Sequence, residues 1–484
     1  MNVLLITLDQ FRGDCLSVTG HPVVRTPNLD RLASAGTLLR RHYSQAAPCS
    51  PGRACLYTGT YQFNNRVVGN GTPLDDRFDN VARAGLRAGY RPTLFGYSDQ
   101  GIDPRMATGP DDPRLSSYEG ILPGFESGLD LVDNQEPWVR WLQELGYDVP
   151  LDGPAALSSE PDRPAEHGTS AFLTDRLLAW LDRQDKPWFA HASYLRPHDP
   201  YAAAGHWSTA YHPDDMPAPI EAPERAWPFA GHLAEFEAPG DAGLRALRAQ
   251  YYGMISAVDE QLGRVWDHLG ELGMWDDTFI VLTSDHGEQL GDQGTVGKGG
   301  FFEASYHIPG IVRDPRHPEG HGTTVDAFTE NVDVFPTLCE AMGIEVPAQC
   351  DGMPLSAFLT GDDPPWWRDA AHWEYDWRWE KILFGPHDWP WDRRLEGQNL
   401  AVLRSESLAY VQFGTGEWRC FDLASDPTWR SEIDDPSVVM ASAQSMLAWR
   451  ASHADRFFTD MLLYNGGMWR VPAAAPPSAG ALAG

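Results

Sequence analysis

The chain has 484 residues, of which 42% are apolar and 22% charged, a composition typical of a globular protein with one large domain and a smaller one. Its formal net charge is −31. A surface this acidic argues against nucleic acid and anionic membranes as partners, but a small anionic substrate can still bind where arginine, lysine or a metal reverses the charge inside a cleft.

The cysteines and the first residues favour a reduced, cytoplasmic protein. The six cysteines are scattered and form no C-x-x-C pair, a pattern typical of a chain without disulfides. The first apolar run, 3–8, is short and ends at Asp9, so we interpret it as a buried strand and not as a signal peptide. We see no run that approaches the ~20 apolar residues of a membrane helix.

Short apolar runs that end in polar residues recur along the chain, as expected for buried strands of a parallel sheet. The predicted strands cover 3–8, 93–96, 188–194 and 279–283. The predicted helices cover 55–61, 78–88, 171–183 and 244–272. Residues 103–165 are rich in Pro, Gly and Asp and are expected to form a long irregular insertion. The alternation predicts an α/β fold with a large doubly wound mixed sheet flanked by helices.

The pattern changes after about residue 395. Short strands are expected at 400–403, 408–413 and 418–422, followed by a helix over 438–458. We therefore predict a catalytic domain over 1–395, a small C-terminal antiparallel sheet plus helix over 396–470, and a flexible Ala/Pro/Gly-rich tail over 471–484. Many of the 19 tryptophans lie in 366–391, where they could pack a core, line a substrate pocket or form a subunit interface.

The most informative motif is Pro48-Cys49-Ser50-Pro51-Gly52-Arg53, followed by Leu56-Tyr57-Thr58-Gly59. A cysteine with Pro two residues on and Arg two further resembles the signature of type I sulfatases. In that family the cysteine is oxidised after translation to formylglycine, and the hydrated aldehyde is the nucleophile. The resemblance implies that Cys49 is catalytic and that a formylglycine-generating or sulfatase-maturating enzyme is a partner of this chain.

Two predicted strands end in adjacent polar residues, Asp9-Gln10 and Asp285-His286. Because ligands bind beyond the carboxyl ends of the strands in open parallel sheets, these side chains can converge on a metal. A lone Asp at a strand end is more often a helix cap. Finding both pairs together with the Cys49 motif favours the metal site.

With these pairs, the chain resembles the sulfatase branch of the alkaline phosphatase superfamily, closest to phosphonate monoester hydrolases and the arylsulfatases related to them. The resemblance implies one divalent cation bound by Asp9, Gln10, Asp285 and His286, with formylglycine 49 as a further ligand. Two carboxylates and an amide suit a hard cation such as Ca²⁺ or Mg²⁺, and an imidazole shifts the preference toward Mn²⁺. We expect Ca²⁺ or Mn²⁺.

Two cationic residues are candidates for the catalytic machinery. Arg53 lies one helical turn from Cys49 and can hold the nucleophile and its loop. Lys298, between two glycines, can bridge the nucleophile and a substrate oxygen.

The resemblance assigns roles to three further residues. It implies that Asn70 and Tyr97 contact the substrate and that His198 is the general acid that protonates the leaving group. Tyr97 stands where many sulfatases carry a Lys, and Asp99 stands where a small hydroxyl residue is expected.

We predict a formylglycine-dependent hydrolase of sulfate monoesters, of arylsulfatase type, that also cleaves phosphonate monoesters or phosphodiesters. Because Tyr97 supplies no positive charge, the site is expected to favour monoanionic substrates over dianionic ones. Phosphonate monoester or phosphodiester cleavage as the main activity stays open, because both reactions need the same groups.

Two other classes of function fit these motifs less well. A metal-binding protein without catalysis would require that Cys49 is never oxidised, and a transferase of the same superfamily would normally carry Ser or Thr in its place. We expect a homodimer, or else a tetramer, with an interface formed by the segments 366–391 and 461–469.

Overall fold

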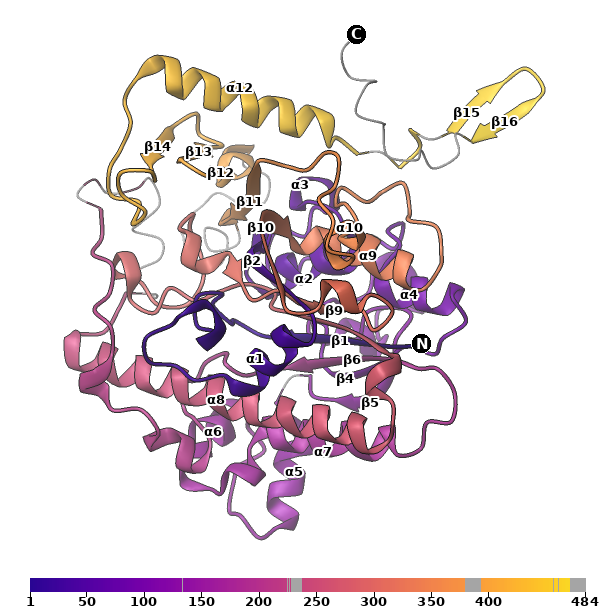
Figure 1. Cartoon of the computed structure of the whole chain (residues 1–484), viewed down its shortest axis with the longest axis vertical. Helices are drawn as coiled ribbons and strands as arrows, with labels where there is room; N and C mark the ends of the chain where they lie inside the picture. Colours follow the sequence, from indigo (N-terminus) through magenta and orange to yellow (C-terminus); the bar gives the residue numbers. More distant parts are fainter. Residues whose placement is uncertain are drawn as a thin grey trace.

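The computed structural model describes the chain except for residues 133, 224, 226, 228–236, 379–392, 456, 460 and 471–484. At its centre is a nine-stranded mixed sheet in the order β10-β2-β9-β7-β1-β6-β4-β5, with β8 paired to β2 (Figure 1). The strands are β1 (Asn2–Leu8), β2 (Thr37–Tyr43), β4 (Thr93–Gly96), β5 (Glu126–Asp130), β6 (Phe189–Tyr194), β7 (Thr278–Thr283), β8 (His307–Ile308), β9 (Ile311–Arg313) and β10 (Thr323–Glu330). The large mixed sheet is confirmed, whereas the tail predicted over 471–484 lies outside the described residues.

The register of β1 decides where polar loops meet. Leu8 pairs in parallel with Tyr194 of β6, and Thr7 pairs in parallel with Thr283 of β7. All three strands therefore end at the same edge of the sheet. The residues that follow them lie side by side at that edge, where ligands bind in open α/β sheets.

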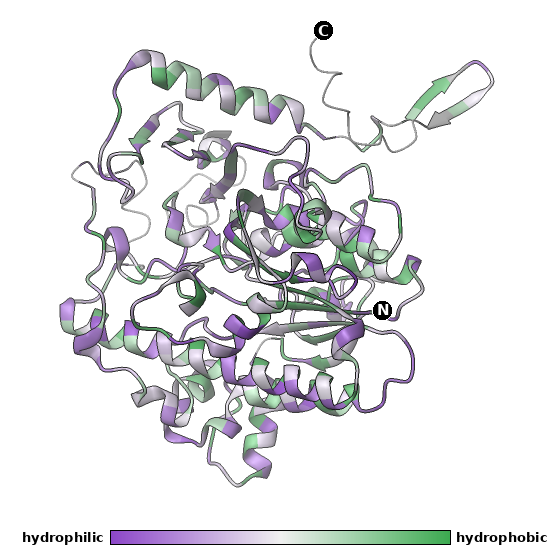
Figure 2. Ribbon diagram, viewed as in Figure 1, coloured by the Kyte–Doolittle hydropathy of each residue, from purple (hydrophilic) through white to green (hydrophobic). Residues whose placement is uncertain are grey.

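Side chains of β1 enter two different cores, because successive residues of a strand point to opposite faces. Leu4, Ile6 and Leu8 pack with the helices of one face, and Val3 and Leu5 pack with those of the other. The helices of the first face include α1 (Pro27–Ser34), α7 (Thr169–Leu181) and α8 (Asp241–Glu271), and those of the second include α2 (Cys49–Thr58), α4 (Val81–Arg87) and α9 (Val334–Ala341). Burial on both faces explains the continuous apolar sequence of the central strands (Figure 2).

A second sheet lies beside the large one, in the order β14-β13-β12-β11-β3. Its strands are β3 (Ala46–Ala47), β11 (Ala370–Asp376), β12 (Asn399–Ser405), β13 (Leu408–Phe413) and β14 (Trp418–Asp422). Helix α12 (Pro436–Ser452) packs on this sheet through Met446 and Trp449. The small sheet with one helix is confirmed, and it also includes β3 and β11, which precede residue 396. The domain boundary at 395 stays a prediction.

Two segments differ from the predicted secondary structure. Helix α2 begins at Cys49 and not at residue 55, because its first turn tolerates Pro51, whose missing N–H has no helical acceptor there. Residues 103–165 are not irregular throughout, since they contain β5, α5 (Glu136–Glu144) and α6 (Gly153–Ser158). Strand β5 reads Glu-Ser-Gly-Leu-Asp and has three exposed residues at the sheet edge, so it carries no apolar pattern.

The tryptophans of 366–391 differ in how deeply they are buried. Trp373 and Trp377 are buried, and the ring of Trp373 stacks on that of Tyr306 with a centroid distance of 5.0 Å. Packing is therefore the role of these two residues. Trp366 is 60% exposed, and Trp379, Trp389 and Trp391 lie outside the described residues.

The last described strands, β15 (Met461–Tyr464) and β16 (Gly467–Arg470), form a hairpin that projects from the body (Figure 1). Its apolar side chains Leu462, Leu463 and Met468 are all exposed, Leu463 by 87%. None of the helices in the described part of the chain combines the length and apolar character needed to cross a bilayer.

Candidate active site

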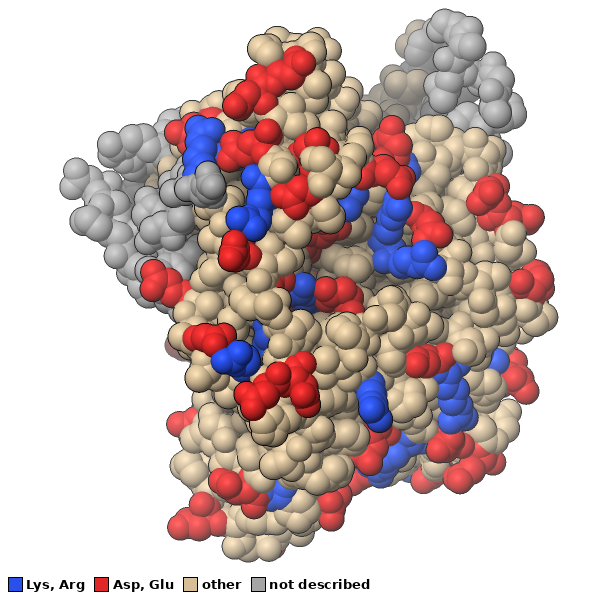
Figure 3. All heavy atoms as spheres, turned by 60° about the vertical axis from the view of Figure 1, so that its left-hand side comes forward, with Lys and Arg blue, Asp and Glu red and all other residues tan. Residues whose placement is uncertain are grey.

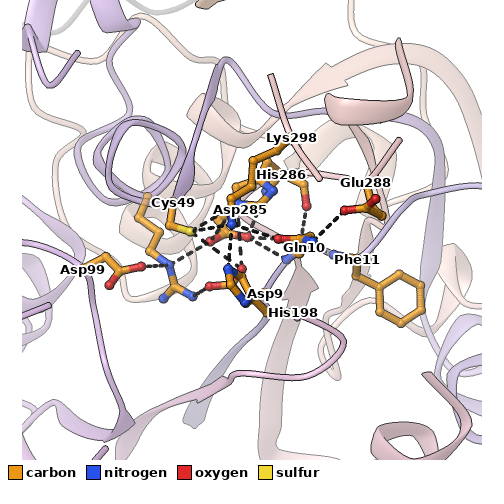
Figure 4. Close-up of polar contacts among 12 residues, drawn as sticks. Asp9, Gln10, Phe11, Cys49, Asp99, His198, Asp285, His286, Glu288 and Lys298 are labelled. Atoms are coloured by element: carbon orange, nitrogen blue, oxygen red, sulfur yellow. Dashed lines mark hydrogen bonds and ion pairs between the residues drawn. The ribbon is translucent and has the colours of Figure 1, made fainter. Parts of the chain in front are cut away.

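Cys49 is the first residue of α2 and lies at the carboxyl edge of the large sheet (Figure 4). Strand β3 of the small sheet leads into it, and the Cys49 side chain is only 4% exposed. The glycine of the motif has a steric reason, because a Cβ at Gly52 would lie 2.3 Å from the carbonyl oxygen of Asp285. Gly52 therefore allows the start of α2 to pack closely against the loop that follows β7.

Four buried side chains from three segments converge at this point. One candidate ligand atom from each of Asp9, Cys49, Asp285 and His286 lies within 4.8 Å of the others. The Cys49 sulfur lies 3.3 Å from His286 Nε2 and 3.8 Å from Asp9 Oδ1. His286 Nδ1 lies 3.0 Å from the carbonyl oxygen of Gly287, which directs Nε2 toward the cluster. Two carboxylates and one imidazole around an oxygen or sulfur ligand fit a divalent cation.

Gln10 is oriented by contacts on both sides of its amide. Its backbone is left-handed, with φ of 64°, and its backbone N–H donates to Asp285 Oδ1 over 3.1 Å. Its Nε2 donates to Glu288 Oε2 over 2.6 Å, and its Oε1 accepts from Lys298 Nζ over 2.8 Å. The amide oxygen thus faces the same side as the Cys49 sulfur, which Lys298 also contacts.

Arg53 is fully buried and holds the two carboxylates in place. Its Nε donates to Asp285 Oδ2 over 2.9 Å, and its Nη2 donates to Asp9 Oδ2 over 3.0 Å. A third carboxylate oxygen, Asp99 Oδ2, lies 3.4 Å from the same Nε. Burial raises the pKa of Asp9, but the positive charges of His198, Arg53 and Lys298 outweigh it and hold that pKa well below its ordinary value.

Lys298 joins the nucleophile to the predicted general acid. Its Nζ lies 3.4 Å from the Cys49 sulfur and 2.6 Å from His198 Nε2. The other ring nitrogen of His198 lies 2.8 Å from the carbonyl oxygen of Asp199. Two residues that are 100 positions apart in the sequence therefore meet beside the nucleophile.

Asn70 and Tyr97 also lie at the site, and each contacts a group that it helps to position. Asn70 Oδ1 accepts from the backbone N–H of Ser50 over 2.9 Å, next to the nucleophile. The hydroxyl of Tyr97 donates to Asp9 Oδ2 over 2.6 Å, and burial together with the negative charge of Asp9 raises its pKa well above 10. Both residues line a cavity of about 330 Å³ that also contains Cys49.

The structure brings all the predicted site residues together: Asp9, Gln10, Cys49, Arg53, Asn70, Tyr97, His198, Asp285, His286 and Lys298. Sequence reasoning missed Glu288, which holds the Gln10 amide and whose pKa is raised to about 7 by burial. A signal was available, since Glu288 follows Asp285 by three residues in the same loop.

Comparison with known proteins decides the family. The family profile described as "Sulfatase" matches residues 1–344, and that described as "N-sulphoglucosamine sulphohydrolase, C-terminal" matches residues 291–450. The chain belongs to the sulfatase family. Members of this family generally use a metal ion and formylglycine, and the buried Asp/Cys/Asp/His cluster could hold the metal.

Three relatives show how far this sulfatase resembles known members. It is 36% identical to the "Multifunctional alkaline phosphatase superfamily protein PehA" of Trinickia caryophylli, over 95% of this chain and 96% of the relative. It is 28% identical to an "Arylsulfatase" of Clostridium perfringens, over 88% of each chain. The solved structure of the phosphonate monoester hydrolase of Agrobacterium radiobacter has 41% sequence identity to this chain and a TM-score of 0.86. The match covers 97% of this chain and 99% of that one.

These similarities confirm the predicted family and fold. This sulfatase is a hydrolase that acts on sulfate or phosphonate esters, and its fold is that of the alkaline phosphatase superfamily.

Proposed function

We propose that this sulfatase hydrolyses esters that carry a single negative charge on the reacting group, with residue 49 acting as a formylglycine. The observation that carries this proposal is the charge around the nucleophile. The guanidinium of Arg53 is occupied by Asp9, Asp285 and Asp99, and Tyr97 supplies a hydroxyl but no charge. Lys298 is thus the cation placed to meet a substrate oxygen next to Cys49.

The chain's own residues suit such a reaction. Oxidised to formylglycine, residue 49 would supply a hydrated aldehyde, of which one hydroxyl attacks while the other later drives release of the product. A divalent cation, Ca²⁺ or Mn²⁺, held by Asp9, Gln10, Asp285 and His286 would supply Lewis acidity at the non-bridging oxygens. Arg53 keeps the two carboxylates in their geometry.

His198 and Lys298 provide the proton and the local charge on the leaving-group side. Both lie beside Cys49, and His198 lines the cavity that opens from it. A histidine that faces the leaving oxygen can protonate it as the ester bond breaks. The ammonium of Lys298 stabilises negative charge that develops between the nucleophile and the reacting centre.

Two substrate classes satisfy the single-charge requirement. Sulfate monoesters, especially aryl sulfates, are the first candidate, as the sequence predicts. Phosphonate monoesters and phosphodiesters are the second, and the similarity to the phosphonate monoester hydrolase of Agrobacterium radiobacter over nearly the whole chain favours them. Rates on 4-nitrophenyl sulfate and 4-nitrophenyl phenylphosphonate, which share one leaving group, rank the two classes.

The nucleophile is tested by mass and activity together. Protein co-expressed with a formylglycine-generating enzyme should show a loss of about 18 Da on the peptide that contains Cys49. Activity on the better of the two esters should rise in proportion to the converted fraction, and Cys49→Ser should lower kcat/KM by at least about a thousandfold. Full activity with an unmodified thiol would contradict the proposal, because a thiol is no hydrated aldehyde.

A further inference from the structure

Asp99 is an acidic residue of the site for which the proposed chemistry has no use. It lies three residues beyond β4 in a left-handed conformation, with φ of 50°, and is 5% exposed. It lines the same cavity as Cys49 and His198. Figure 4 shows it on the Cys49 side of the cluster, at the opposite end from Glu288.

The negative charge of Asp99 is only partly matched by its neighbour. Its Oδ2 lies 3.4 Å from Arg53 Nε, but the same nitrogen makes a shorter bond of 2.9 Å to Asp285. The Nη2 of Arg53 is engaged with Asp9 over 3.0 Å. One guanidinium is therefore shared by three carboxylates, and Asp99 makes the longest of the three contacts.

Other acidic side chains line the same cavity. Its lining includes the acids Asp9, Asp99, Glu119 and Asp199. Among the described residues that line it there is no Lys or Arg. On the face shown in Figure 3 the acidic side chains are interleaved with Lys and Arg, whereas Lys and Arg are absent from the described lining of the cavity.

We propose that Asp99 is a specificity-determining residue that discriminates against doubly charged groups bound beside residue 49. The proposal rests on the proposed function and names the residue that sets its single-charge preference. A second negative charge on the reacting group would lie close to the Asp99 carboxylate, and the two like charges would repel each other. A singly charged sulfate ester, phosphonate ester or phosphodiester is repelled less by Asp99 than a doubly charged group is. Burial raises the pKa of Asp99, with Arg53 opposing it and Asp9 adding to it, so the discrimination should grow as the pH rises.

The first test measures binding without turnover. Benzenesulfonate and phenylphosphonate have nearly the same shape, but phenylphosphonate carries two charges at about pH 9. In the Asp99→Asn variant, the calorimetric Kd for phenylphosphonate at that pH should fall by about tenfold, whereas the Kd for benzenesulfonate should stay within about twofold. A tenfold change is the size expected when one charge is removed from a partly screened site. Equal changes for both ligands, or no change for either, would overturn the proposal.

The second test measures selectivity in the reaction. The ratio of kcat/KM for 4-nitrophenyl phosphate to that for ethyl 4-nitrophenyl phosphate compares a dianion with a monoanion that has the same leaving group. Asp99→Asn should raise this ratio by about tenfold. An unchanged ratio in a folded variant would overturn the proposal. If the wild-type protein cleaves neither these esters nor 4-nitrophenyl sulfate and 4-nitrophenyl phenylphosphonate, the proposed function fails, while the binding test still decides the role of Asp99.

Two further variants make these tests specific. Asparagine fits the left-handed backbone of residue 99, and Asp99→Ser provides a second, smaller neutral residue if Asp99→Asn does not fold. Asp267→Asn removes the same charge from a side chain that is 65% exposed and pairs with Arg31 on the surface. This control should leave the Kd values of both ligands and the ratio of kcat/KM values unchanged. An effect equal to that of Asp99→Asn would show that net charge, and not position 99, sets the preference.

Discussion

Arg53 is the buried cation that contacts the carboxylates of the site. It is fully buried between Asp9 and Asp285, and burial of these carboxylates without a cation is strongly unfavourable. Its guanidinium also donates to Ser193 Oγ over 2.8 Å, which links α2 to the end of β6. The side chain therefore has a structural role that is separate from any contact with substrate.

We predict that Arg53→Ala lowers the free energy of unfolding of the metal-free protein by about 3–5 kcal/mol, because it leaves two buried carboxylates unpaired. Urea unfolding in the presence of a chelator measures this value. Arg31→Ala is the matched control, since Arg31 is 46% exposed and pairs with Asp267 at the surface. It should cost less than about 1 kcal/mol. A similar loss for both variants would show that Arg53 does not hold the site.

At the residue scale, sequence reasoning succeeded where a motif marks a residue and failed where only packing does. The Cys49 motif and the two strand-end pairs are local patterns, and all their members meet in the structure. Glu288 supports Gln10 through a contact between two different loops, and its spacing from Asp285 marks the loop but not this partner. The sharing of Arg53 among three carboxylates was missed for the same reason.

At the scale of elements, the loop after β6 is held by a buried ion pair. Arg196 Nε donates to Glu160 Oε2 over 2.9 Å, and Arg196 Nη1 donates to the carbonyl oxygen of His198 over 2.7 Å. The same side chain donates to the carbonyl oxygen of Leu157, the next-to-last residue of α6, over 3.3 Å. Arg196 thereby joins the loop of the predicted general acid to another wall of the cavity, which Leu157 also lines.

We predict that Arg196→Lys lowers kcat/KM by about 10- to 100-fold for esters of weakly acidic phenols, and by less for esters of 4-nitrophenol, because a displaced His198 protonates the leaving oxygen poorly. The slope of log kcat/KM against leaving-group pKa should become steeper. A Lys ammonium cannot reproduce the several N–H donors of the Arg guanidinium, so this conservative change is enough to break the contacts of Arg196. Arg264→Lys, at a surface pair with Asp175, should not change the slope. Equal losses on all leaving groups would contradict the positioning role.

The elements that sequence analysis predicted share one physical property, which is burial of a regular apolar pattern. β1, β4 and β7 are buried at every residue and were recognised from their apolar runs. β5 has one buried side chain and was not recognised, because an edge strand needs no apolar face. α5 and α6 lie in a segment where Pro, Gly and Asp dominate, so their short helices are fixed by tertiary contacts and caps, such as the Asp152 side chain that accepts from Ala155 N–H.

At the scale of the whole molecule, the projecting hairpin β15–β16 is the best candidate for a contact between copies. Exposed side chains such as Leu463 are unfavourable in water, and an acidic chain with a net charge of −31 needs apolar contacts to overcome its own repulsion. The predicted homodimer or tetramer stays a prediction.

We expect the protein to sediment with at least twice the mass of one 53.7 kDa chain, and the double variant Leu462→Asp, Leu463→Asp to sediment with a smaller mass. Both side chains are exposed within one chain, so charging them should not disturb its core. Met440→Asp on α12, which replaces a side chain that is 61% exposed, is the control and should leave the mass unchanged. A wild-type protein that sediments as a single chain would exclude the predicted oligomer.

The short strand β3 has a consequence for when residue 49 can be modified. It pairs with β11 through Ala46 and Glu374, and Cys49 follows it directly into the buried site. During synthesis more than three hundred residues separate the emergence of Cys49 from that of Glu374. We therefore expect a maturating enzyme to reach Cys49 before β11 completes the small sheet, so the rate at which the chain is completed should compete with the rate of oxidation. Slower translation of the segment before residue 370 should increase the fraction of active molecules without any change in their sequence.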